Sequence, residues 1–251
     1  MARVVTLGTA AAVPDEAHAN TYLALEGEQG FFLIDCADSP LMRMRRVDLA
    51  PERLRGLIIT HFHPDHACGV PILLMNIWLL GRTEPLPVYG LPDVLERFET
   101  MMGLFYWQEW PEFFPVSCRP VTEEVGALVL EDEEFRITGA PVKHVVPTIG
   151  LRVENKRSGG VMAYSGDTSP CDAVVALARD ADILIHEAAK DTLGHSSAAQ
   201  AGEIARRAGA GRLVLIHYRP APHKYDRWLE EAAATFGGPV ELAQDFGEYE
   251  F

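Results

Sequence analysis

Short runs of apolar and β-branched residues alternate along this chain with longer stretches of helical periodicity. Short apolar runs bounded by polar or turn residues are typical of strands, and we expect strands at Val4–Leu7, Thr21–Leu25, Phe31–Asp35, Leu57–Thr60, Val88–Gly90, Ala127–Leu130, Glu134–Thr138, Thr148–Glu154, Val161–Tyr164, Ile183–Ile185, Leu213–Ile216 and Val240–Ala243. The longer periodic stretches predict helices at Val70–Leu80, Asp93–Met102, Asp172–Ala178, Ser197–Ala208 and Asp226–Thr235.

Strand runs followed by helices occur in both halves of the chain, with no low-complexity linker between the halves. Elements in this order predict an α/β protein (α+β, four layers) in which two similar halves pack as an αββα sandwich. We therefore expect one domain over residues 1–251. Residues 103–122 interrupt the pattern with six aromatic residues among prolines, and we interpret them as a partly ordered wall beside a functional site.

The composition is that of a folded protein, because 48% of the residues are hydrophobic and 23% are charged. The net charge of −14 disfavours broad contact with a phosphate backbone. Met1–Leu7 does not resemble a secretory signal, and Gly69–Leu80, the most apolar run, is shorter than a membrane span. We expect a cytoplasmic protein that does not enter membranes, with Cys36, Cys68, Cys118 and Cys171 as free thiols.

Three of the nine histidines lie within six residues, in His61-Phe62-His63-Pro64-Asp65-His66, directly after a predicted buried strand. Neutral imidazole nitrogen and carboxylate oxygen are ligands suited to zinc, iron or manganese. His61 and His63 point the same way in an extended turn, while Asp65 and His66 could serve a second ion. The sequence therefore predicts a metal site at this loop.

This hexapeptide resembles the H-x-H-x-D-H signature of the metallo-β-lactamase superfamily, and further matches follow in order at His144, Asp167 and His217. The resemblance implies an αββα metallo-β-lactamase sandwich with two Zn²⁺ ions, Mn²⁺ or Fe being compatible with the same ligands. It assigns His61, His63 and His144 to one metal, Asp65, His66 and His217 to the other, and Asp167 to both.

Two such ions can share a hydroxide that attacks the substrate, and Asp65 could also orient it. Asp35 resembles the superfamily carboxylate that fixes the tautomer of a ligand imidazole.

Several other segments resemble ribonuclease Z and its phosphodiesterase relatives: Leu7-Gly8-Thr9, the stretch Tyr164–Cys171, His186-Glu187-Ala188 and Gly194-His195-Ser196-Ser197. By this resemblance His195 is a catalytic residue that contacts a phosphoryl oxygen or donates a proton to the leaving group, and Glu187 orients it. The alternatives are that His195 and Ser196 cap the following helix, and that His186 is a core residue.

The long basic arm with which ribonuclease Z grips tRNA has no counterpart here, since only a short hairpin lies between Thr148 and Val161. We therefore expect a phosphodiesterase that acts on a small anionic ester, a phosphodiester or cyclic phosphate, through a bridging hydroxide. The alternatives are a thioester or lactone hydrolase, a tRNA 3′-processing endoribonuclease, and a metal-bearing module that binds another protein through the aromatic segment. A homodimer is compatible with all of them.

Other polar residues have more ordinary interpretations. Arg219, directly after Tyr218, is either an anion ligand or a surface residue, and His18 either lines the pocket mouth or lies on the surface. For His223 we expect a surface role. Five arginines occur close together in the sequence, and we expect them to lie on solvent-exposed helix faces: Arg43, Arg45, Arg46, Arg53 and Arg55.

Overall fold

The strands of the chain form two mixed sheets of seven strands each in the computed structural model, which describes residues 2–190 and 192–251 apart from the side chain of His223. The first sheet has the order β14-β1-β2-β3-β4-β5-β6. Its strands are β1 (Arg3–Gly8), β2 (Tyr22–Gly27), β3 (Gly30–Ile34), β4 (Leu54–Ile58), β5 (Leu86–Gly90), β6 (Val116–Pro120) and β14 (Glu248–Glu250).

The second sheet has the order β13-β12-β11-β10-β9-β8-β7. Its strands are β7 (Ala127–Glu131), β8 (Phe135–Pro141), β9 (Ile149–Asn155), β10 (Val161–Tyr164), β11 (Ile183–Glu187), β12 (Leu213–Ile216) and β13 (Val240–Leu242). Apolar side chains from both sheets, such as Leu33 and Ile185, belong to one continuous buried cluster. The core of the molecule therefore lies between the two sheets.

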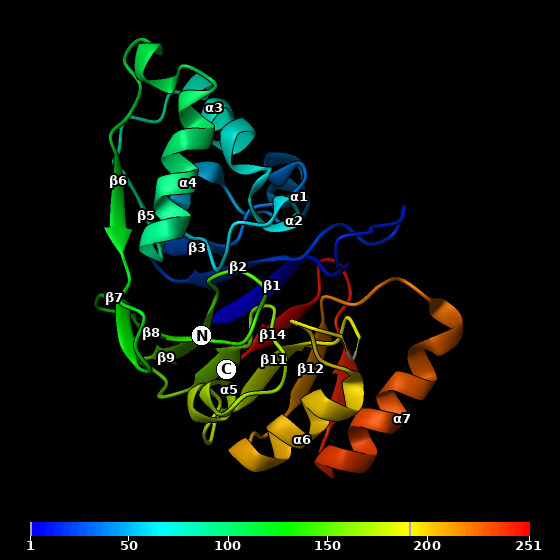
Figure 1. Ribbon diagram of the computed structural model, residues 1–251. Helices are drawn as coiled ribbons and strands as arrows, with labels where there is room; N and C mark the ends of the chain where they lie inside the picture. The colour runs from blue at the N-terminus through cyan, green and yellow to red at the C-terminus, as the bar shows by residue number, and fades with distance from the viewer. Residues whose placement is uncertain (1, 191) are drawn as a thin grey trace.

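Helices cover the two outer faces, as Figure 1 shows. Those on the first sheet are α1 (Pro40–Arg46), α2 (Pro64–Ala67), α3 (Val70–Leu79) and α4 (Pro92–Gly103), with the short 3-10 helices η1 (Pro51–Arg53) and η2 (Trp107–Glu109). Those on the second sheet are α5 (Asp172–Leu177), α6 (Ala198–Ala208) and α7 (Tyr225–Phe236), which follows the 3-10 helix η3 (Pro222–Lys224). The four-layer αββα sandwich expected from the sequence is confirmed. None of the described helices has the length and apolar character needed to cross a membrane.

Four short elements were not expected from the pattern: α1, α2, β6 and β14. In β6 no residue is fully buried, and β14 places one buried tyrosine between two exposed glutamates, so neither strand carries a clear apolar run. The aromatic segment that precedes β6 packs on the outer helices. Trp110 stacks on Trp78 of α3 with ring centroids 5.1 Å apart, and Trp107 meets Phe98 of α4 edge-on at 5.7 Å.

Parallel pairing determines where polar side chains can gather. Strands β3, β4 and β5 are parallel neighbours in the first sheet, and β10, β11 and β12 are parallel neighbours in the second. Because the carboxyl ends of parallel strands meet at one edge of a sheet, the loops after these strands lie together. Asp35, His61, Asp167 and His217 all occupy such loops.

Candidate metal centre

Three imidazoles converge at the loop that follows β4. His61 Nε2 lies 3.2 Å from His63 Nδ1, and His144 Nε2, from the loop between β8 and β9, lies 3.2 Å from the same His63 atom. Burial lowers the pKa of His61 well below its ordinary range, so this imidazole is neutral and offers a lone pair. Nitrogen ligands at about 2.0–2.1 Å from a tetrahedral zinc are about 3.3 Å apart, so these three atoms fit one metal ion.

A second group lies beside the first. His66 Nε2 is 3.3 Å from His217 Nε2, and Asp65 Oδ2 is 3.7 Å from His66 Nε2 and 3.5 Å from His217 Nε2. Asp65 and His66 belong to α2, which begins at Pro64 directly after His63. The backbone angle φ of Pro64 is fixed near the helical value, so the chain turns into a helix at this residue. As a result, His63 faces one group, while Asp65 and His66 face the other. The donor set of one carboxylate and two imidazoles also suits a divalent metal.

Asp167 contacts both groups. Its Oδ1 lies 3.5 Å from His66 Nε2, and its Oδ2 lies 3.4 Å from His217 Nε2, 3.8 Å from His61 Nε2 and 4.0 Å from His144 Nε2. The carboxylate is buried, and Oδ1 has no hydrogen-bond partner among the described residues. A buried carboxylate oxygen without a donor is costly unless a cation faces it, so this atom also fits a metal site.

Hydrogen bonds fix the rings of three of these histidines. His66 Nδ1 donates to Asp35 Oδ2 at 2.8 Å. The Thr60 hydroxyl lies 3.1 Å from His61 Nδ1 and donates to the same Asp35 carboxylate. His144 Nδ1 donates to the carbonyl of Gly194 at 2.7 Å. Each bond occupies Nδ1 and leaves Nε2 free to face the cluster. Asp35 thus makes the contact expected of it, whereas Thr60 and Gly194 were not singled out, although each directly precedes a histidine in the sequence.

Replacement of Asp35 by asparagine is expected to weaken zinc binding about 10–100-fold, because the amide can no longer accept hydrogen bonds at both positions from His66 and Thr60. The backbone should tolerate the change, since φ of Asp35 is 62° and asparagine adopts this left-handed conformation readily. Competition with a chromophoric chelator measures the affinity. Asp38→Asn is the matched control, because Asp38 is also left-handed (φ 53°) but exposed. Equal affinities in the two variants would contradict the role of Asp35.

A buried carboxylate and a half-buried histidine form a pair at the rim of this cluster. Glu187, at the end of β11, accepts hydrogen bonds from the backbone N–H groups of Thr168 (3.0 Å) and Ala189 (2.9 Å). It also accepts one from His195 Nδ1 at 2.9 Å. This bond to Glu187 raises the pKa of His195 and favours the imidazolium form. The His195 ring stacks on His217 with centroids 5.7 Å apart, and Nδ1 is 3.9 Å from Asp167 Oδ2.

The helix-cap alternative for His195 and Ser196 is wrong, because Ser197 caps α6 through a reciprocal bond with Gln200. His186 is a core residue: it is fully buried, its Nδ1 donates to the Glu187 carbonyl at 2.7 Å, and burial lowers its pKa to about 4. It belongs to none of the groups of described residues that could hold a metal ion.

The other polar residues divide between surface and interior. His18 is buried, donates through Nδ1 to Asp15 at 2.8 Å, and packs its ring on Tyr218, so a surface role for it is wrong. Arg219 is exposed. Among the clustered arginines, Arg45 and Arg46 are exposed as expected, but Arg43 pairs with the buried carboxylate of Asp245. The side chain of His223 lies outside the described part of the structure.

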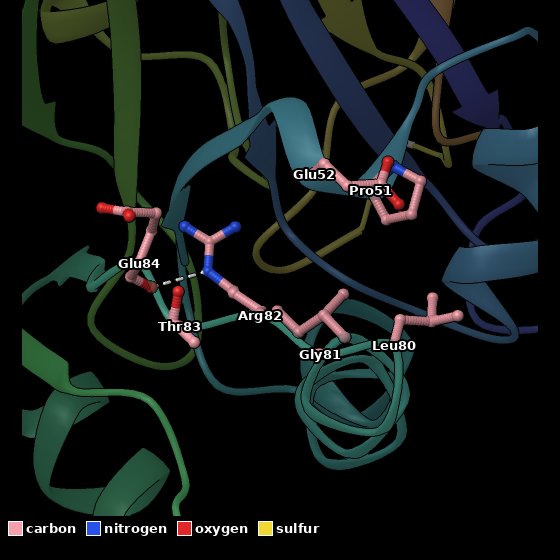
Figure 2. A pocket seen from close by; sticks show the side chains of 8 residues that line it. Pro51, Glu52, Leu80, Gly81, Arg82, Thr83 and Glu84 are labelled. Atoms are coloured by element: carbon pink, nitrogen blue, oxygen red, sulfur yellow. Dashed lines mark hydrogen bonds between the residues drawn. The ribbon is translucent and has the colours of Figure 1, made fainter.

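A separate pocket of about 180 Å³ lies between η1 and the end of α3, where Figure 2 shows its lining side chains. Arg82 is its most prominent polar group, but this side chain already donates to the carbonyls of Leu54 (2.9 Å), Glu84 (2.9 Å) and Pro85 (3.1 Å). The pocket contains none of the clustered histidines or of the aspartates beside them. Arg82 therefore holds the loop after α3 in place, and the pocket is separate from the candidate metal centre.

Comparison with known proteins gives four findings. The family model described as the beta-lactamase superfamily domain matches residues 31–218. A ribonuclease Z from Mycobacterium sp. (strain KMS) is 33% identical, over 100% of this chain and 96% of the relative. A crystal structure of the short form of human tRNase Z matches with a TM-score of 0.80 and 27% identity, over 99% of this chain and 98% of that one.

The metallo-beta-lactamase fold protein YhfI from Bacillus subtilis has a similar structure, with a TM-score of 0.84, 24% identity and coverage of 99% and 98% of the two chains. At this identity the likeness establishes the fold alone. The described His, Asp and Glu residues include groups that could hold a metal ion, and every member of these groups was named as a candidate site residue from the sequence.

Proposed function

Because the chain belongs to the metallo-β-lactamase superfamily, on its ribonuclease Z branch, and is a hydrolase of that fold, we propose that it hydrolyses small phosphodiesters or cyclic phosphates with two zinc ions. In this proposal His61, His63 and His144 hold one ion and Asp65, His66 and His217 the other. Asp167 contacts both. Divalent ions at these positions would lower the pKa of a water molecule and neutralise charge on the phosphate oxygens.

The Glu187–His195 pair carries the proposal. Glu187 occupies His195 Nδ1, and Nε2 has no hydrogen-bond partner among the described residues, so this nitrogen is free to hold a proton beside the cluster. An alkoxide leaving a phosphodiester needs a proton, whereas a thiolate leaving a thioester does not. A positioned acid at the cluster therefore favours phosphodiester over thioester hydrolysis.

The hairpin between β9 and β10 supports a small substrate. Its tip contains Lys156 and Arg157, but Lys156 Nζ bonds Glu131 at 3.0 Å and Arg157 pairs with Glu28. Both cations are thus bound to carboxylates of the protein itself. Together with the net charge of −14, this leaves little positive surface for gripping a long nucleic acid.

Cleavage of precursor tRNA is the second candidate, and the similarity to a ribonuclease Z along the whole chain favours it. The decisive assay compares bis-p-nitrophenyl phosphate, a cyclic nucleotide, a glutathione thioester, an acyl lactone and a precursor tRNA with a 3′ trailer, all with zinc-loaded protein. We expect the highest kcat/KM on one of the two phosphodiesters. Efficient release of the trailer without turnover of the small substrates would replace the proposal by tRNA processing, and preference for the thioester or lactone would also overturn it.

A further inference from the structure

His217 differs from His61, His66 and His144 in how its ring is held. His61, His66 and His144 each use Nδ1 in a hydrogen bond, but the buried Nδ1 of His217 has no partner among the described residues. Its backbone is also unusual, with φ of 51° in the left-handed region, which non-glycine residues adopt only where the surroundings enforce it. Since no hydrogen bond at Nδ1 fixes this ring, its direction depends on its backbone and on the His195 ring stacked against it.

The backbone on either side of His217 is attached to different sheets. The carbonyl of Ile216, at the end of β12, accepts from Ala188 N at 2.8 Å. On the other side, Tyr218 N donates to the Thr9 carbonyl at 3.3 Å, and the Tyr218 carbonyl accepts from Ala11 N at 2.9 Å. His217 thus lies at a junction between β12 in one sheet and the loop after β1 in the other.

A buried set of side chains secures this junction. The hydroxyl of Tyr218, a residue without exposed surface, donates to the Ala243 carbonyl at 2.7 Å and lies 3.4 Å from the Thr9 hydroxyl. Thr9 in turn donates to Asp245 Oδ1 at 2.6 Å. Asp245 Oδ2 accepts from Ala19 N at 2.9 Å and pairs with Arg43. The C-terminal segment that carries Asp245 runs back beside β1, red against blue in Figure 1.

We propose that Asp245, Thr9 and Tyr218 together position His217 and so determine one metal site and not the other. The Thr9 hydroxyl donates to Asp245, the Thr9 carbonyl accepts from Tyr218 N, and the Tyr218 hydroxyl donates to the Ala243 carbonyl. The inference rests on the proposed two-metal function. Among the described residues, none of the three belongs to a group that could hold a metal ion, and the link to the candidate ligands is the peptide bond from His217 to Tyr218. They are positioning residues, and their removal should change the affinity for a single ion.

The test measures the two zinc dissociation constants by chelator competition in Thr9→Val and Tyr218→Phe, two variants that keep side-chain shape and remove one hydroxyl each. We expect the zinc dissociation constant of the site that contains His217 to rise about 10–100-fold, as when a group supporting a metal ligand is lost. The constant of the other site should stay unchanged. Thr6→Val is the matched control. Thr6 is equally buried and donates to the Gln244 carbonyl at 2.6 Å, hence to the same C-terminal segment. Its hydroxyl bonds in the described structure go to that segment and not to Tyr218.

Double variants assign the effect to His217. Thr9→Val should add no further loss in a His217→Ala background and should add its full loss in a His144→Ala background. Equal weakening by Thr9→Val and Thr6→Val, or equal weakening of both ions, would overturn the inference while leaving the two-metal function intact. A single zinc in the wild-type protein, determined by elemental analysis, would instead overturn the two-metal function and this inference with it.

Discussion

Asp167→Asn is expected to lower the rate of phosphodiester hydrolysis by about 10²–10³-fold, the usual loss when one preorganised electrostatic group leaves an active site. Asp167 has oxygen atoms within 4.0 Å of imidazoles from both groups, including His66 and His144. Asparagine keeps the size of the side chain but supplies no negative charge between two cations. Affinity for both metals should therefore fall together.

Steady-state kinetics with bis-p-nitrophenyl phosphate and zinc analysis of the same samples check this result. Asp172→Asn is a suitable control, because Asp172 also follows β10 but is exposed and pairs only with Arg207 on the surface. A variant at position 167 that keeps both zinc ions and full activity would show that Asp167 does not connect the two sites.

His195→Ala is expected to reduce turnover of a cyclic nucleotide by about 10²–10⁴-fold, the range attributed to a positioned general acid. Its effect should depend on the leaving group. A p-nitrophenolate ion departs without a proton, whereas a sugar alkoxide requires one. The same variant should therefore lose much less activity on bis-p-nitrophenyl phosphate, and its zinc content should match the wild type.

Glu187→Gln refines this experiment, because the amide keeps the shape of Glu187 but removes the charge that orients and protonates His195. We expect an intermediate loss with the same dependence on the leaving group. Equal losses of His195→Ala on both substrates would contradict an acid role and would point instead to contact with a phosphoryl oxygen. The ratio of the two rates therefore separates the two roles that the sequence left open for His195.

Much of the fold could be predicted because its central strands are buried on both faces. The runs at Leu213–Ile216 and Val161–Tyr164 are continuous apolar segments, and the strands β12 and β10 have those same bounds. The prediction was poorer at the edges. Strand β4 begins three residues before the expected Leu57, and β6 was not expected, because an exposed edge strand needs no apolar pattern to pair with its neighbour.

The residues of the candidate centre were all named from the order of motifs along the chain, and the structure brings them within hydrogen-bonding range of one another or close to it. Their types and local spacing carry the information, since the H-x-H-x-D-H loop has to place its side chains at a strand end. The roles of these residues in metal binding and catalysis remain predictions, which the substitutions above address.

The sequence by itself determined the order of the central strands and of the longer helices, the two-sheet class of fold and the identities of the clustered histidines and carboxylates. Only the tertiary structure decided how each ring is held. Asp35 bonds His66 and Gly194 bonds His144, whereas Nδ1 of His217 has no hydrogen-bond partner among the described residues. It also placed Arg43 on buried Asp245, where the sequence predicted a solvated face. The physical reason is the same in each case. Apolar periodicity is a local property of the chain, whereas a hydrogen-bond partner more than 200 residues away, as for Arg43, is defined only when the two sheets pack together.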